Sequence, residues 1–228
     1  MILNKVAENI WTIEGDVVSF YGLPYPTRMT VVRLSNDDLW IHSPVKISNN
    51  LIDVILELGE VKYLIAPNNL HHLFLADWVK RFPNAFSYSP PGLVKKRKDI
   101  TFSKELGMQS EDEWSPEIDQ TIFKGSPFKE VVFFHRNSKT VIFADLIENF
   151  KPEFFNRWQR MVGKFAGILS PHGKAPLDFR LSFAFGKNKA KKSLSIIMEW
   201  NPENIIISHG ECILGGGLEF LKKSFSWV

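Results

Sequence analysis

The chain has 228 residues, enough for one large domain or two small ones, and 44% of them are hydrophobic, so a substantial core is available. The net charge of +3 is modest and gives no reason to expect nucleic acid as a partner. The single cysteine excludes an intrachain disulfide and fits a reducing compartment. Neither a secretory signal nor an apolar run of membrane-spanning length is visible, so we expect a cytoplasmic protein with no membrane contact.

The first part of the chain has the pattern of antiparallel hairpins. Alternating and β-branched residues predict strands at 9–20, 28–34 and 39–42. A link rich in Gly and Pro, residues 22–26, separates the first two, and the polar turn 35–38 separates the next two.

The pattern then changes to alternating helices and strands. A helix is predicted from the cap at Ser48 to Gly59, followed by a strand at 61–65. A second helix is predicted from Asn69 to Phe82, ended by Pro83, and a further strand at 85–88. This order indicates an α/β unit with a partly parallel sheet.

The second half begins with a charged, polar loop and continues with a hairpin. The segments 130–134 and 140–143 flank a polar turn. Pro152 opens a predicted helix that extends to Phe165 and has Phe154, Phe155, Trp158 and Met161 spaced for burial. A helix at 187–200, a strand at 204–208 and a helix at 217–225 follow. No segment reads as a linker, so we expect a single domain over residues 1–228.

Imidazole and carboxylate side chains stand at the ends of three apolar strands. His71 and His72 follow the strand at 61–65, Asp145 follows the second strand of the hairpin, and His209 follows the last strand. A metal site needs ligands that come from rigid elements and converge beside loops that leave room for a substrate. The layout therefore favours a metal site.

The order of these elements resembles the metallo-β-lactamase superfamily. The resemblance is carried by ENIWTIEG with MTVVRLSNDDLWIHSP at the start, by VIFADLIE before Asp145 and by IIISHGE around His209. It implies an α/β (α+β) fold, the four-layer αββα sandwich. The segments YPTRMTVVRL and PNNLHHLFLADWVKRFPNA, with SHG, resemble a bacterial branch known only as a domain of unknown function, with a degenerate metal signature.

The signature loop of that superfamily, His-x-His-x-Asp-His, falls on residues 67–72. Pro67 and Asn69 then stand in place of the two leading histidines, and no histidine stands near Gly125, where another ligand would lie. The first metal position of the superfamily is therefore lost. At the second position the resemblance carries His72, Asp145 and His209 over as ligands, and His71 takes the place of its aspartate.

These residues imply at most one ion. His71, His72, Asp145 and His209 suit Zn²⁺, or Fe²⁺ or Mn²⁺, and a protein without metal is the alternative. His72, Asp145 and His209 are the predicted catalytic set. Side chains of adjacent residues on a helix point about 100° apart, so we expect only one of the two neighbouring histidines to face the cleft, and assign that position to His72.

The resulting hypothesis is a metal-dependent hydrolase with a small-molecule substrate. The first alternative is an inactive, metal-free scaffold that binds a small ligand or a protein partner, and the second is an iron protein with a redox role. Six residues are candidates for substrate binding in either hydrolase or scaffold, namely Tyr21, Tyr25, Arg28, Asn69, His172 and Arg180. His172 is read as an acid or base or as a plain loop residue, and Arg180 as an anion clamp or as a partner of Asp178 or Glu199.

Overall fold

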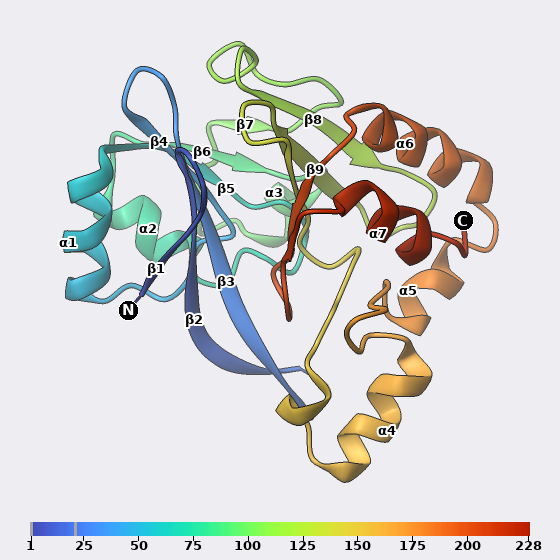
Figure 1. Cartoon of the computed structure of the whole chain (residues 1–228). Coiled ribbons are helices and arrows are strands. Elements are labelled where there is room, and N and C mark those ends of the chain that lie inside the picture. Colours follow the sequence, from blue (N-terminus) through green and yellow to red (C-terminus); the bar gives the residue numbers. More distant parts are fainter. Residues whose placement is uncertain (1, 21) are drawn as a thin grey trace.

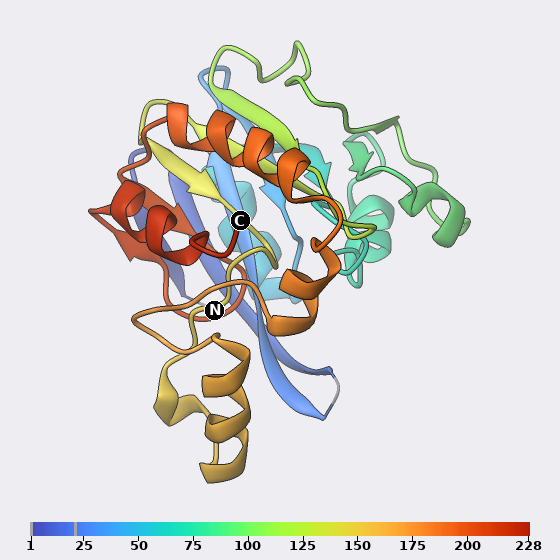
Figure 2. The same ribbon diagram turned by 90° about the vertical axis from the view of Figure 1, so that its right-hand side faces the viewer.

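The computed structural model describes residues 2–20 and 22–228, without the side chain of Phe20 (Figure 1). Tyr21, one of the predicted ligand-binding residues, lies outside the described residues. The described chain forms two sheets packed face to face with helices on both outer faces (Figures 1 and 2). The predicted four-layer αββα sandwich is confirmed.

The first sheet follows the chain order. Its strands are β1 (Leu3–Ala7), β2 (Ile10–Phe20), β3 (Leu23–Arg33), β4 (Asp38–His42), β5 (Glu60–Ile65), β6 (Phe86–Ser89) and β7 (Lys104–Glu105). The pairs from β1 to β4 are antiparallel, and those from β4 to β7 are parallel. The parallel part arises where helices cross over between strands, as the alternating pattern predicted.

The second sheet has the order β12–β11–β10–β9–β8. Its strands are β8 (Ile118–Phe123), β9 (Glu130–His135), β10 (Thr140–Ile142), β11 (Asn204–Ile206) and β12 (Ile213–Leu214). The hairpin β9–β10 is as predicted, and β10 pairs in parallel with β11.

The helices cover the two outer faces and one end of the sandwich. They are α1 (Asn49–Leu58), α2 (Leu75–Arg81), α3 (Leu93–Lys96), the 3-10 turn η1 (Pro152–Phe154), α4 (Arg157–Ala166), α5 (Leu177–Ser182), α6 (Lys187–Glu199) and α7 (Gly217–Ser224). None of the helices in the described residues is long and apolar enough to cross a membrane.

Three apolar layers correspond to the three contacts between the four layers. Met29, Val31 and Ile41 of the first sheet pack against Leu51 and Ile55 of α1. The neighbours of these residues along the strands point to the opposite face of the first sheet. There Val32 and Trp40 pack against residues of the second sheet, namely Phe133, Ile142 and Ile206. On the far side Val141 and Ile205 pack against Ile197 of α6 and Leu221 of α7. The alternation of side chains along each strand thus builds two interfaces per sheet.

Two predicted helices are corrected. The helix predicted from Asn69 begins only at Leu75, because the Asn68 side chain accepts hydrogen bonds from the backbone N–H groups of Leu70 and His71 and holds a turn there. The helix predicted from Pro152 is split, with a new start at the capping box of Asn156 and Gln159. Of its apolar residues only Phe155 is buried, and Trp158 and Met161 are exposed.

Candidate metal centre

Three strand ends bring the candidate ligands to one edge of the sandwich. His71 follows β5, Asp145 follows β10, and His209 follows β11. Because β10 and β11 are parallel, their chains leave the second sheet on the same side. The backbone N–H of Val131 donates to the carbonyl of Pro67, which ties the loop after β5 to the second sheet.

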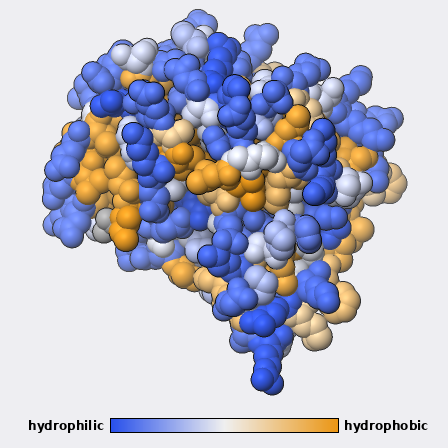
Figure 3. Space-filling view, in the orientation of Figure 1, coloured by the Kyte–Doolittle hydropathy of each residue, from blue (hydrophilic) through white to orange (hydrophobic). Residues whose placement is uncertain are grey.

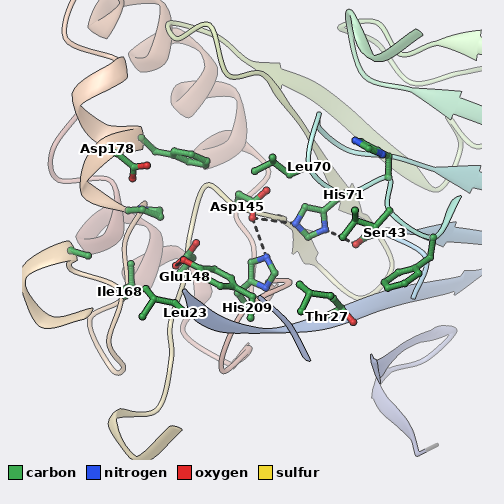
Figure 4. Close-up of a pocket in the computed structure, with 18 of the residues that line it drawn as sticks. Leu23, Thr27, Ser43, Leu70, His71, Asp145, Glu148, Ile168, Asp178 and His209 are labelled. Carbon is green, nitrogen blue, oxygen red and sulfur yellow. Dashed lines mark hydrogen bonds and ion pairs between the residues drawn. The ribbon is translucent and has the colours of Figure 1, made fainter. Parts of the chain in front are cut away.

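The two imidazole rings meet at one carboxylate oxygen. Nε2 of His71 and Nε2 of His209 each lie 3.1 Å from Oδ1 of Asp145. In Figure 4 both rings point toward Asp145. The ligand atoms of the three residues all lie within 4.8 Å of one another. Two ligands bound to one tetrahedral Zn²⁺ at 2.0–2.1 Å are roughly 3.3 Å apart, so this donor set fits a single divalent ion.

The other ring nitrogens are held by neighbours. Nδ1 of His209 lies 2.8 Å from the carbonyl oxygen of Pro26, which can only accept, so Nδ1 carries the proton. Nδ1 of His71 lies 2.6 Å from Oγ of Ser43. Partners of this kind orient a metal-binding histidine and set its tautomer. In the neutral form, Nε2 of His209 then presents a lone pair to the site.

The lone pairs of His209 Nε2 and Asp145 Oδ1 cannot face each other at 3.1 Å without a positive charge between them. The contact between His209 and Asp145 therefore requires either a proton on Nε2 or a cation. Burial alone would lower the pKa of His71, but the charge and hydrogen bond of Asp145 raise that pKa above its usual value. Burial disfavours the Asp145 carboxylate, yet His71 and His209 hold its pKa far below the usual range. The site is built to keep Asp145 ionised.

A buried polar platform fixes Asp145. The Asn68 amide donates to Oδ2 of Asp145 (2.7 Å) and to Oε2 of Glu130 (2.9 Å), and all three residues are buried. Glu130 accepts from the backbone N–H groups of Ala144 and Asp145. Burial and the nearby charge of Asp145 raise the pKa of Glu130. Neither Asn68 nor Glu130 was identified from the sequence as a site residue.

His72 is placed differently from the sequence expectation. Its Nδ1 lies 2.6 Å from Nη1 of Arg97, which also donates to the His72 carbonyl oxygen at 2.8 Å. Burial and the positive charges of Lys96 and Arg97 lower the pKa of His72 to about 4. The turn held by Asn68 directs His71 into the site and leaves His72 to Arg97. Both histidines therefore line the cavity, contrary to the expectation of only one, and it is the ring of His71 that reaches Asp145.

A cavity of about 420 Å³ opens beside the three ligands (Figure 4). Most of its wall is apolar, with Val18 and Leu23 from the β2–β3 hairpin, Val162 and Ala166 from α4, Ile168, and Phe179 from α5. His72 contributes to the wall, although its ring is paired with Arg97. An apolar cavity with a few converging polar groups is the usual form of a small-molecule site.

Glu148 is a polar group of this cavity that sequence analysis missed. It is 3% exposed, and the Tyr25 hydroxyl donates to its Oε2 at 3.3 Å. Burial, with the nearby charge of Asp145, raises the pKa of Glu148 well above its usual value. Its position three residues after Asp145, in the run Asp145-Leu146-Ile147-Glu148, is the signal that could have identified it.

Of the six predicted ligand-binding residues, Tyr25 lines the cavity. Its ring packs edge-on against the ring of His209, with 5.0 Å between the ring centroids. Arg28 pairs with Glu14 at 2.6 Å and donates to the carbonyl oxygen of Ile207. Of the five that lie within the described residues, four are not part of the cavity wall, namely Arg28, Asn69, His172 and Arg180.

Arg180 makes a structural contact between two helices. Its Nη2 donates to the carbonyl oxygen of Ala166 at 2.8 Å and so joins α5 to the end of α4. His172 is exposed in the loop between these helices. The carbonyl oxygen of Asn69 accepts from Lys96.

Comparison with solved structures defines the class of fold. The chain is similar to the DIM-1 metallo-β-lactamase exposed to ceftazidime (TM-score 0.67, 16% identity, 99% of this chain and 95% of that chain). It is similar to a metallo-β-lactamase from Pontibacter korlensis (0.66, 11%, 99% and 97%) and to one from Hirschia baltica (0.60, 12%, 99% and 96%). The fold is that of the metallo-β-lactamases.

Residues 7–159, about two thirds of the chain, match the family model DUF4336, a domain of unknown function. The chain belongs to the DUF4336 family. No curated protein matches it.

Proposed function

We propose that this protein is a metal-dependent hydrolase in which a single ion is held by His71, Asp145 and His209. The observation that carries the proposal is the convergence of two Nε2 atoms on Oδ1 of Asp145, with both Nδ1 atoms engaged by neighbours. Three protein ligands of these types leave a position open, as catalytic sites do. When bound, the ion supplies a Lewis acid that polarises a carbonyl or phosphoryl oxygen.

The proton for the leaving group comes from Glu148 in this proposal. Tyr25 donates to Oε2, which leaves Oε1 to carry the acidic proton toward the cavity. Water adds to the carbonyl carbon, the bond to the leaving oxygen or sulfur breaks, and Glu148 protonates that atom. The proton lost by the water restores Glu148. A carboxyl group kept protonated by burial is suited to this role.

The cavity favours a substrate with an apolar acyl group. The wall residues Val18, Leu23, Val162 and Phe179 offer no hydrogen bonds to a polar substituent, whereas the carboxyl groups of the wall are Asp145, Glu148 and, on α5, Asp178. An ester or thioester with a hydrocarbon chain would place its carbonyl at the ligands and its chain along α4 and α5.

The test is turnover of medium-chain and acetyl thioesters by chelator-treated protein and by protein reloaded with Zn²⁺, Mn²⁺ or Fe²⁺. We expect turnover only in a loaded form, with the medium-chain substrate preferred by about 10-fold or more, since each buried CH₂ contributes roughly 0.8 kcal/mol. Equal turnover before and after chelation would contradict the proposal.

The second candidate function is a metal-free scaffold that binds an apolar ligand. The observation that favours it is that protons on Nε2 of His71 and His209 would satisfy Asp145 without a metal ion. For this function, His209→Ala would leave binding of a hydrophobic probe in the cavity almost unchanged. For the hydrolase, the same change would remove metal-dependent turnover.

A further inference from the structure

The helices α4 and α5 expose a surface that a soluble protein usually buries. On α4 and its approach, Phe154, Trp158, Met161 and Phe165 follow one another at helical spacing, and Trp158 is 62% and Phe165 76% exposed. Leu177, Leu181 and Phe185 form a second exposed row along α5 and the turn after it. We call these seven residues the outer apolar face. Contiguous exposed apolar surface of this kind marks an interaction site.

This face belongs to a well-formed element. Asn156 and Gln159 close a capping box at the start of α4, and Arg180 ties its end to α5. Val162 of α4, one turn after Trp158, and Phe179 of α5 line the cavity, so the apolar row of α4 begins beside the cavity wall. In Figure 2, α4, coloured gold, projects from the lower end of the molecule, beside the blue end of the β2–β3 hairpin. Trp158 and Phe165 remain exposed on this ordered helix.

The segment that carries the outer apolar face is rich in basic residues. Residues 151–192 contain ten Lys and Arg and two acids, whereas the whole chain has a net charge of only +3. On α4 the exposed basic residues Arg157, Arg160 and Lys164 run beside the apolar row, and this helix contains no acid. Figure 3 shows hydrophobic and hydrophilic groups side by side on the lower right lobe, where Figure 1 places α4 and α5.

From this combination we infer that α4 and α5 dock on an anionic lipid surface. A helix that lies in the membrane interface has Trp, Phe and Leu on one side and Lys or Arg on the other. Basic residues at an anionic leaflet add attraction of about 1 kcal/mol each. The sequence led us to expect no membrane contact, and the exposure of Trp158, Phe165 and Phe185 is the observation that changes this expectation.

Other occupants fit less well. A symmetric dimer through this face would bring the same patch of each copy together, and so place basic residues opposite basic residues. Nucleic acid would neutralise the positive charge, but its phosphate backbone would not bury the apolar side chains of Met161, Leu177 and Leu181. The lipid surface satisfies both the charge and the apolar rows.

The experiment is co-sedimentation of the full chain with phosphatidylcholine vesicles, with and without about 30% phosphatidylglycerol. We expect binding to the anionic vesicles, weakened at least about 10-fold by high salt. The variant Phe165→Ser/Phe185→Ser should lose about 10-fold or more in binding, and Arg157→Gln/Lys164→Gln should lose a similar factor. All four residues are exposed, so the variants should fold.

Matched controls lie elsewhere on the surface. Leu56→Ser changes an exposed residue of α1, and Lys95→Gln/Lys98→Gln removes two exposed charges from the other basic run. Both should bind anionic vesicles as the unmodified protein does. Absence of binding to anionic vesicles, or equal binding by all variants, would overturn the inference. So would a dimer in solution that Phe165→Ser/Phe185→Ser dissociates, because the face would then belong to a second copy.

Discussion

The centroids of the imidazole rings of His71 and His209 lie 5.1 Å apart, and the ring planes are tilted by 46°. In the chain, 137 residues separate the two histidines. Each ring turns Nε2 toward the same oxygen of Asp145 and Nδ1 toward a fixed partner. Two loops from different sheets therefore hold a site that is arranged before anything binds.

Replacement of Asn68 by Ala should lower the free energy of unfolding by about 2–4 kcal/mol, because it leaves Asp145 and Glu130 buried without their shared donor. Urea denaturation measures the change. The matched control is Asn69→Ala, since the Asn69 side-chain oxygen has no hydrogen-bond partner among the described residues. A loss for Asn69→Ala as large as that for Asn68→Ala would refute this account of the platform.

The stability of the protein should fall in acid partly through His42. This ring is 1% exposed, stacks on Trp40, and has no hydrogen-bond partner among the described residues. Burial, with the nearby charge of His71, lowers its pKa to about 3. The unfolded chain, with a pKa near 6.5, takes up a proton that the folded chain refuses, so stability is lost from pH 6.5 downward to about 3 by up to about 1.4 kcal/mol per unit.

The variant His42→Phe isolates this contribution, since other histidines remain in place. Its free energy of unfolding should change less between about pH 7 and pH 5 than that of the unmodified protein. Two parallel pH profiles would show that His42 does not contribute.

Glu148→Gln should reduce turnover of an active ester or thioester by about 10² to 10⁴ and leave the metal content unchanged, because the amide keeps the shape of the carboxyl group and lacks its acidic proton. The milder change Tyr25→Phe removes the donor to Oε2 and should have a smaller effect. Steady-state kinetics, with elemental analysis of the same samples, separates the two readouts. Full activity in Glu148→Gln would exclude it as the proton donor.

Gly210 should be far less tolerant of Ala than Gly215. Both have positive φ angles, +96° and +85°, so each substitution costs about 1–2 kcal/mol for the left-handed backbone. A Cβ at Gly210 would also lie 2.2 Å from the carbonyl oxygen of Asn149, whereas one at Gly215 meets nothing within 4 Å. The clash should add about 1–3 kcal/mol and displace His209 next to it. Thermal unfolding of the two variants gives the comparison, and equal losses would contradict it.

Hydrophobic patterning was sufficient to predict most of the fold, since strands such as β5 and helices such as α1 are defined by their own residues. The strand β8 was missed, because its polar residues Asp119 and Gln120 interrupt the apolar pattern. At the site, strand ends predicted the positions of Asp145 and His209. The choice between His71 and His72 depends on contacts with Asn68 and Arg97, and no local pattern reveals partners from distant loops.

Local sequence pattern was also insufficient to predict the surroundings of α4. Its apolar spacing predicted burial of Trp158 and Met161, but a periodic pattern identifies an apolar side without stating what covers it. Glu148 acquires its raised pKa from burial beside Asp145 and Tyr25, which requires the folded chain.

Whether His71 and His209 hold an ion is measured by elemental analysis of untagged protein after exposure to Zn²⁺, Fe²⁺ or Mn²⁺, with the variants His71→Ala, His209→Ala and His72→Ala. The account predicts about one ion per chain in the unmodified protein and in His72→Ala, with His172→Ala as a further control, and loss of the ion in the other two. Less than about a tenth of an equivalent in the unmodified protein, or loss of the ion in His72→Ala alone, would contradict it.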